Sequence, residues 1–180
     1  YEEIGGGAIL VGANSNITVT NSTFTNMTSS GEGGAITIYT EDNRGNLIVT
    51  NSTFNHITAS GEGGAIYCYG GRGSIIVTNS TFNHIESTNG RGGVIYSEGS
   101  RRSIVTVISS TFNNTKADNN YGGGAIYCNS NITVINSNFT NILSVFGGAI
   151  RTAGNATGIN SNVNHVIANG DGGAIYVNGQ

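Results

Sequence analysis

The chain of 180 residues contains no proline and no tryptophan, and only 9% of its residues are charged. Seven Lys and Arg face ten Asp and Glu, which gives a formal net charge of −3. Without a basic field, nucleic acid is not an expected partner. No run of about 18 apolar residues occurs, so no membrane insertion is expected of this segment. Polarity comes instead from Asn, Ser and Thr, and attached sugar is one candidate for hydrating so weakly charged a surface.

Two short phrases recur together along the whole chain. Copies of Gly-Gly-Ala-Ile, with Val for Ala in the fourth, begin at Gly6, Gly33, Gly63, Gly92, Gly123, Gly147 and Gly172. The second phrase, clearest as Asn51-Ser52-Thr53-Phe54, recurs with its aromatic at Phe24, Phe54, Phe82, Phe112 and Phe139 and with Val163 in the last copy. Copies lie about 24 to 31 residues apart, the spacing of a solenoid repeat. Residues 1–180 are therefore interpreted as one β-helix segment, part of a longer or fibre-forming chain.

Each repeat predicts three short strands. Apolar residues two apart, such as Leu47 and Val49, precede each Asn-Ser pair and indicate a strand with one buried face. The aromatic follows the Asn by three positions, an odd offset that requires a bend at Asn-Ser. The Gly-Gly-Ala-Ile phrase supplies the third strand. The sequence therefore predicts an all-β fold, a parallel β-helix of about six to seven coils.

Aligned repeats place like residues in columns. We expect the aromatic column to stack in the interior, and the corner column to form a buried amide ladder through Asn21, Asn51, Asn79, Asn136 and Asn160. Leu at position 79 should then destabilise the fold more than Ser at position 96. The column that holds Thr37 and Arg151 should face water. Its tyrosines, a candidate binding surface, are Tyr67, Tyr96, Tyr127 and Tyr176.

The cysteine, histidine and acidic residues of the sequence indicate no catalytic or metal site. Cys68 and Cys128 share a column two coils apart, too far for a disulfide, so free thiols are expected. His56 and His84 stack in another column, where two ligands without a carboxylate are a weak metal signal. The acidic residues are scattered over loops, and we expect Glu62 and Arg91 to be solvated. No acid–base pair is evident, so no enzymatic activity and no cofactor are predicted.

Nine Asn-x-Ser/Thr motifs occur in the chain. Those at Asn21, Asn51 and Asn79 lie in the predicted buried corner, and Asn26 lies at the second bend, so all four are set aside. The remaining motifs point outward by strand parity. They are the candidate glycan-attachment sites Asn16, Asn113, Asn131, Asn138 and Asn155. The alternative is that none of them is modified.

The pairing of Gly33-Gly34-Ala35-Ile36 and its later copies with a Ser-Thr-Phe phrase resembles the polymorphic outer-membrane protein repeats of chlamydiae and of some protist surface proteins. In Phe24-Thr25-Asn26 the Asn comes one place earlier than in the family's usual Phe-x-x-Asn, and Phe54 and Phe82 are followed by Asn-His. The resemblance implies a right-handed β-helix at the cell surface, acting as an adhesin or stalk.

Three functions are consistent with these patterns. The first is a non-enzymatic extracellular rod, structural or adhesive, which would be a glycosylated filament subunit if copies stack end to end and carry glycan. The partner would then be a second copy, or a host or neighbouring cell surface or its glycan. The second is a carbohydrate-binding module that uses the tyrosine column. The third and weakest is a polysaccharide lyase or hydrolase.

Overall fold

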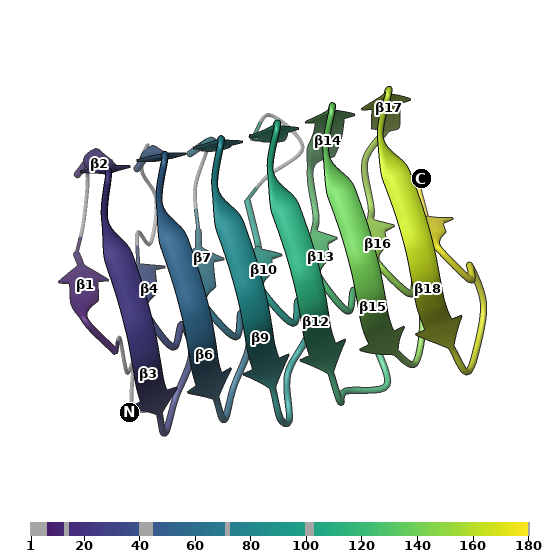
Figure 1. The fold of residues 1–180 in the computed structure, drawn as a ribbon, viewed down its shortest axis with the longest axis horizontal. Helices are drawn as coiled ribbons and strands as arrows, with labels where there is room; N and C mark the ends of the chain where they lie inside the picture. Colours follow the sequence, from purple (N-terminus) through teal and green to yellow (C-terminus); the bar gives the residue numbers. More distant parts are fainter. Residues whose placement is uncertain (1–6, 13–14, 40–44, 71–72, 100–102, 180) are drawn as a thin grey trace.

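A computed structural model of the chain describes residues 7–12, 15–39, 45–70, 73–99 and 103–179. These residues form strands and loops but no helix, and the strands belong to three parallel sheets (Figure 1). Each sheet takes one strand from every coil, so neighbours in a sheet are about one repeat apart in the sequence. The predicted three-strand coil and the β-solenoid are confirmed.

The three sheets are named in chain order. The first sheet contains β1 (Ile9–Val11), β4 (Ile36–Tyr39), β7 (Ile66–Tyr69), β10 (Ile95–Ser97), β13 (Ile126–Cys128), β16 (Ile150–Thr152) and β19 (Ile175–Val177). The second contains β2 (Ile17–Thr20), β5 (Leu47–Thr50), β8 (Ile75–Thr78), β11 (Ile104–Ile108), β14 (Asn131–Ile135) and β17 (Ala156–Ile159). The third contains β3 (Thr23–Ser29), β6 (Thr53–Ala59), β9 (Thr81–Ser87), β12 (Thr111–Ala117), β15 (Asn138–Ser144) and β18 (Asn162–Ala168).

The aromatic column stacks in the interior as predicted. Phe54 pairs in register with Phe82, their ring centroids are 4.7 Å apart, and both side chains are fully buried. The same stacking extends to Phe24 at one end and through Phe112 to Phe139 at the other. Because inward Ile, Leu and Val columns of the other two sheets pack against these rings, the core is one continuous cluster along the solenoid.

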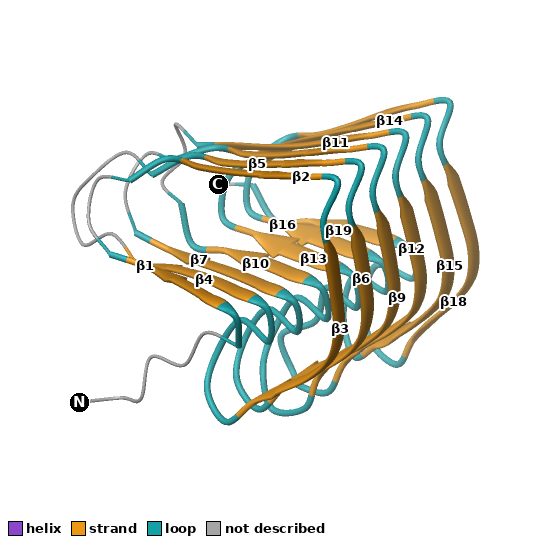
Figure 2. Cartoon of the chain, turned by 60° about the vertical axis from the view of Figure 1, so that its left-hand side comes forward, coloured by secondary structure: helices purple, strands orange, loops and turns teal. Residues whose placement is uncertain are grey.

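Two columns of left-handed residues turn each coil. At the corner between the second and third sheets, Asn21 and its equivalents have φ between 47° and 51° (Figure 2). A second column, which includes Asn26, His56 and His84, has φ between 49° and 55° inside the strands of the third sheet. One left-handed residue there reverses the alternation of side chains, so Phe54 and Ile57 both point inward although they are three residues apart. Asn tolerates this conformation better than most residues.

The buried ladder at the corner is made of serine, so the prediction for Asn21, Asn51, Asn79, Asn136 and Asn160 is wrong. Those five asparagines are exposed, because the left-handed backbone turns their side chains outward. The following serine points inward. The Ser80 hydroxyl donates to the Thr78 carbonyl (2.9 Å) and accepts from the Ser52 amide (3.1 Å), and the other coils repeat this arrangement.

Replacement of Ser80 by Ala should destabilise the protein. The change leaves the Ser52 amide and the Thr78 carbonyl without these bonds in a buried corner, which costs about 1–3 kcal/mol. Urea unfolding followed by circular dichroism measures this loss. The matched control is Ser109→Ala, because Ser109 is the exposed residue just before the next ladder serine. Equal midpoints for the two variants would contradict the assignment of the ladder to serine.

Candidate functional site

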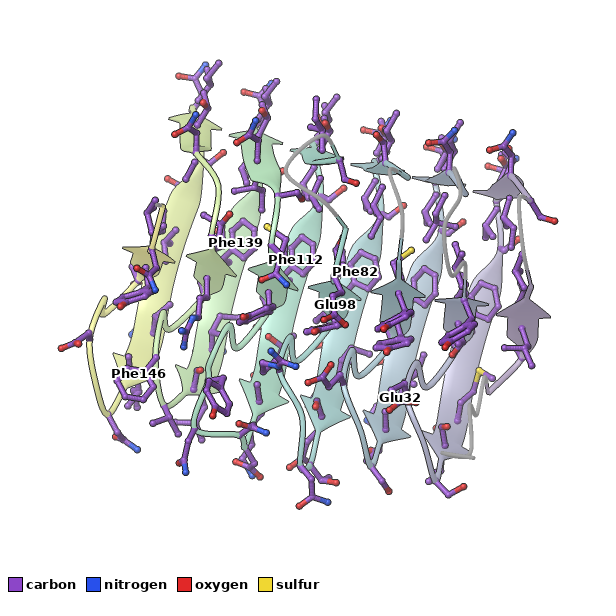
Figure 3. All side chains as sticks on the ribbon, turned by 180° about the vertical axis from the view of Figure 1, so that it is seen from behind. Glu32, Phe82, Glu98, Phe112, Phe139 and Phe146 are labelled. Carbon is purple, nitrogen blue, oxygen red and sulfur yellow. The ribbon has the colours of Figure 1, made fainter. Side chains whose placement is uncertain are left out.

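A layer of aromatic rings lies on the outer side of the first sheet (Figure 3). The rings of Tyr67 and Tyr96 stack with centroids 5.4 Å apart, and those of Tyr96 and Tyr127 with centroids 5.3 Å apart. Tyr69 packs against the same group. Tyr67, Tyr96 and Tyr127 come from one register column of β7, β10 and β13, so their stack follows directly from the strand pairing, whereas Tyr69 lies two residues further along β7.

Residues that precede the Gly-Gly pairs cover this layer. The Arg91 guanidinium carbon lies 4.8 Å from the centroid of Tyr96 and 4.9 Å from that of Tyr127. Its Nε donates to Glu62 Oε1 at 2.6 Å, and both side chains of this ion pair are only partly exposed. Burial raises the pKa of the Glu62 carboxyl above its usual value, although Arg91 acts in the opposite direction. The expectation that Glu62 and Arg91 are solvated is therefore wrong.

The expectation that the tyrosine column faces water is also wrong for its central members. Tyr67, Tyr96 and Tyr127 are only 7%, 0% and 8% exposed, and Thr37 is fully buried. The reason is that Arg91, which precedes one Gly-Gly pair, lies over the rings and is held there by Glu62, which precedes the pair one coil earlier. Tyr176 and Arg151 remain half-buried. The central rings consequently present no open face on which a ligand could stack.

These positions reverse the expected order of two substitutions. Tyr96→Ser should lower the free energy of unfolding by about 3 kcal/mol. This value lies toward the lower end of the range for truncation of a buried aromatic side chain, because Arg91 and Glu62 can close over part of the gap. Asn79→Leu places a larger side chain on exposed left-handed backbone and should cost about 1–2 kcal/mol. Thermal unfolding of the two variants measures the difference. A lower midpoint for Asn79→Leu than for Tyr96→Ser would overturn this ordering.

A second arginine lies further along the same layer. Arg151 occupies the column position after Tyr127 and before Tyr176. Its guanidinium carbon lies 5.0 Å from the Tyr176 ring centroid and 5.6 Å from that of Tyr127. It also donates a hydrogen bond to the carbonyl of Tyr121, a residue that is 56% exposed. Arg151 thus lies between the buried Tyr127 and the more accessible Tyr121 and Tyr176.

The five candidate glycan-attachment residues lie at the surface in differing environments. Asn16 and Asn155 are exposed, whereas Asn113, Asn131 and Asn138 are half-buried. The side-chain oxygens of Asn16 and Asn131 accept from backbone amides of the next coil, at 3.1 and 2.9 Å. Asn113 bonds to Asn83 and Asn141, and Asn138 to Thr140. Their glycosylation stays a prediction.

The three corner motifs were set aside for a wrong reason. Asn21, Asn51 and Asn79 are each followed by Ser and Thr, and all three side chains are exposed. The spacing of the side chains in the sequence could have shown that these asparagines are exposed. Each corner Ser is two residues before the inward aromatic and therefore shares its face, which leaves the Asn outside.

The cysteine and histidine columns lie as the repeat predicts. Cys68 and Cys128 are free thiols on either side of Ser97 in the register, as predicted. The rings of His56 and His84 stack with centroids 4.7 Å apart, as their shared column predicts. Among the described residues, no group of three or more His, Cys, Asp and Glu could hold a metal ion. The same described part of the chain contains no helix long and apolar enough to cross a membrane.

The last coil leaves the interior of the solenoid accessible. A cavity of about 420 Å³ opens there between Phe139, Ile150, Ala156, Gly158 and Val163, among other lining residues. Ala156, Gly158 and Val163 stand where the preceding coil has Ile132, Val134 and Phe139, so smaller side chains create the space. The edge strands β17, β18 and β19 each pair with one described neighbour only. This end of the described rod is therefore apolar and carries unpaired strand edges.

The fold and the columns of like residues show that this protein is a parallel β-helix whose coils share one sequence pattern. Within it, residues 51–69 match the Chlamydia polymorphic membrane protein repeat. This span holds Asn51-Ser52-Thr53-Phe54 and Gly63-Gly64-Ala65-Ile66, so the resemblance seen in the sequence is confirmed for this coil. Neither the curated proteins nor the solved structures include a significant match to the chain.

Proposed function

We propose that this chain is a non-enzymatic, extracellular β-helical rod whose copies associate end to end at a cell surface. The carrying observation is the regular register of the coils, in which each column continues from strand to strand, and in the last described coil Ile175 and Val177 of β19 are 44% and 50% exposed beside the apolar cavity. Unpaired strand edges with apolar side chains favour association with further strands. The match to a repeat of polymorphic membrane proteins supports the surface location.

The occupant that fits this end best is the first coil of a second copy. Continuing each column across such a junction would set Phe24 over Val163, Ile17 over Ala156 and Val19 over Gly158. Phe24 and Ile17 are only partly buried in the described first coil. Their larger side chains would enter the space that Ala156, Gly158 and Val163 leave, so bulky residues at one end complement small residues at the other.

Enzymatic activity is less well supported because the described carboxylates are occupied in ion pairs or dispersed. Glu62 binds Arg91, and Glu86 and Asp118 both bind Lys116. A rod with such a surface needs hydration from elsewhere. We extend the glycan candidates to Asn21, Asn51 and Asn79, whose exposure removes the objection to them. Intact mass before and after enzymatic deglycosylation of the natively expressed protein tests this part.

Sedimentation velocity over a range of concentrations, with electron microscopy of the largest species, tests end-to-end association. The wild-type chain should form rods longer than one molecule. Val163→Lys, which places a charge in the end cavity, should remain monomeric. Thr157→Lys is the matched control, because Thr157 lies on the same coil with an exposed side chain in the outward column of the second sheet. A monomeric wild type, or equal assembly of both variants, would refute the proposal.

A further inference from the structure

The aromatic layer of the first sheet has a gap in its cover. Before the Gly-Gly pair, two successive coils carry Glu62 and Arg91, whereas the next coil carries Gly122. Gly122 has a φ of 85°, and a Cβ there would lie 1.7 Å from the Phe146 carbonyl oxygen, so the backbone excludes any side chain. The cover that Glu62 and Arg91 provide is therefore interrupted at Gly122.

A pocket lies beyond this gap. Its volume is about 250 Å³, and it is lined by Asn120, Tyr121, Phe146, Arg151 and Tyr176. Phe146 projects from the loop between β15 and β16 (Figure 3). Tyr121 and Asn120 are exposed, whereas Phe146, Arg151 and Tyr176 are half-buried. Aromatic side chains thus form the walls and an arginine lies among them.

Arg151 differs from the other cations of the described chain in its partners. Arg91 and Lys116 are each ion-paired with carboxylates, but none of the ion pairs among the described residues includes Arg151. The faces of its guanidinium lie near the rings of Tyr121, Tyr127 and Tyr176. The Nη1 of this guanidinium donates to the Tyr121 carbonyl, and the remaining N–H groups lie in the same fixed plane, which suits a planar carboxylate.

We propose that this pocket binds an acidic sugar residue, a hexuronate, through Arg151. The carboxylate would accept from the Arg151 edge, the ring would lie against Phe146 and the exposed Tyr121, and the Asn120 amide would be available to hydroxyl groups. The volume is below the range of about 300–1,000 Å³ that encloses drug-sized ligands, so it suits a single ring at a time. The site does not depend on end-to-end association.

The negative charge of Asp171 should weaken the binding of an anion in this pocket. This residue is exposed, and its backbone carbonyl accepts from the amide of Gly147, the residue after Phe146, which places it one coil beyond the pocket wall. A negative charge in the neighbouring coil opposes the binding of an anion. Asp171→Asn should therefore strengthen hexuronate binding, whereas it should leave a neutral sugar unaffected.

Titration of the labelled protein with glucuronate, followed by amide NMR shifts, tests the proposal. Glucuronate should shift the amides of residues 120–121, 146–151 and 176 with a dissociation constant in the range of about 0.1–10 mM, and glucose should bind at least about tenfold more weakly. Arg151→Gln should weaken glucuronate binding at least about tenfold. Lys116→Gln, which removes a cation from the third sheet, is the matched control and should bind as the wild type does.

Tyr121→Ala is a second variant, needed in case Arg151→Gln fails to fold. Because Tyr121 is exposed, its loss should weaken glucuronate binding and leave the amide shifts of the rest of the protein unchanged. No shifts at about 50 mM glucuronate would overturn the proposal. Equal binding by Arg151→Gln, or equal binding of glucose, would overturn it too. Tighter binding of benzoate than of glucuronate would overturn the sugar assignment and identify an aromatic carboxylate site. Because the wild type can be monomeric and still bind, failure here is distinct from failure of end-to-end association.

Discussion

Alanine at position 93 is expected to cost more than about 4 kcal/mol and to prevent the central coils from closing. The ideal Cβ on Gly93 would lie 2.1 Å from the carbonyl oxygen of Gly124 and 2.5 Å from that of Lys116. Both contacts are with backbone of the adjoining coil, where the Gly124 amide donates to the Gly148 carbonyl and the Gly124 carbonyl accepts from the Thr115 hydroxyl, so this backbone cannot withdraw without breaking hydrogen bonds. Gly93 is therefore needed for close approach, since its own φ is not in the left-handed region.

Urea unfolding followed by circular dichroism measures the loss, and Gly158→Ala is the control. No atom lies within 4 Å of the position that a Cβ on Gly158 would take, and this residue lies in strand β17. Its replacement should be neutral or should stabilise the strand by about 0.5–1 kcal/mol. A Gly93→Ala protein that unfolds within about 0.5 kcal/mol of the wild type would show that the coils are further apart than the structure has them.

The fold was predictable from the sequence because each coil repeats one pattern. The inward alternation of Leu47 and Val49, and the odd offset between Asn51 and Phe54, fix a strand, a corner and a second strand. The repeat length then sets the register. A regular pattern repeated in successive coils specifies columns well, since a slip of one residue would expose every buried member at once.

Which side chain points inward at the corner could also have been predicted from the sequence, provided that the left-handed backbone at the Asn was recognised. Strand parity alone places Asn51 on the inward face with Val49, in agreement with the expected buried amide ladder. The left-handed conformation at Asn51, with φ at 50°, transfers the inward face to Ser52. The recurrence of Asn at this position is itself a signal for left-handed backbone, because Asn adopts it more readily than most residues.

The cover of the tyrosine layer could not be predicted from the columns. Glu62, Arg91 and Gly122 occupy one position in three successive coils, and they share neither charge nor size. Whether such a loop residue folds over the strand or points to water depends on what it meets there. The stacked rings of Tyr96 and Tyr127 attract the Arg91 guanidinium, and this interaction exists only once the coils are assembled.

Alanine at position 82 is expected to destabilise the protein by about 3–5 kcal/mol. The Phe82 ring is fully buried and stacks on two neighbours, with centroids 4.7 Å from Phe54 and 4.9 Å from Phe112. Its removal empties the centre of the coil and weakens two interfaces between coils. In a solenoid, stability is close to a sum of such nearest-neighbour terms, so the loss affects unfolding of the whole central region.

Phe24→Ala is the matched control because Phe24 has the same column position but a less complete environment. Its ring stacks on Phe54 alone among the described residues, at 4.7 Å, and it is only partly buried. This substitution should cost about half as much as Phe82→Ala, since one interface instead of two is weakened. Urea midpoints and slopes for both variants measure the two losses. Equal losses at the two positions would mean that the stability does not reside in contacts between adjacent coils, and the account of the solenoid as stacked, separately contributing layers would have to be abandoned.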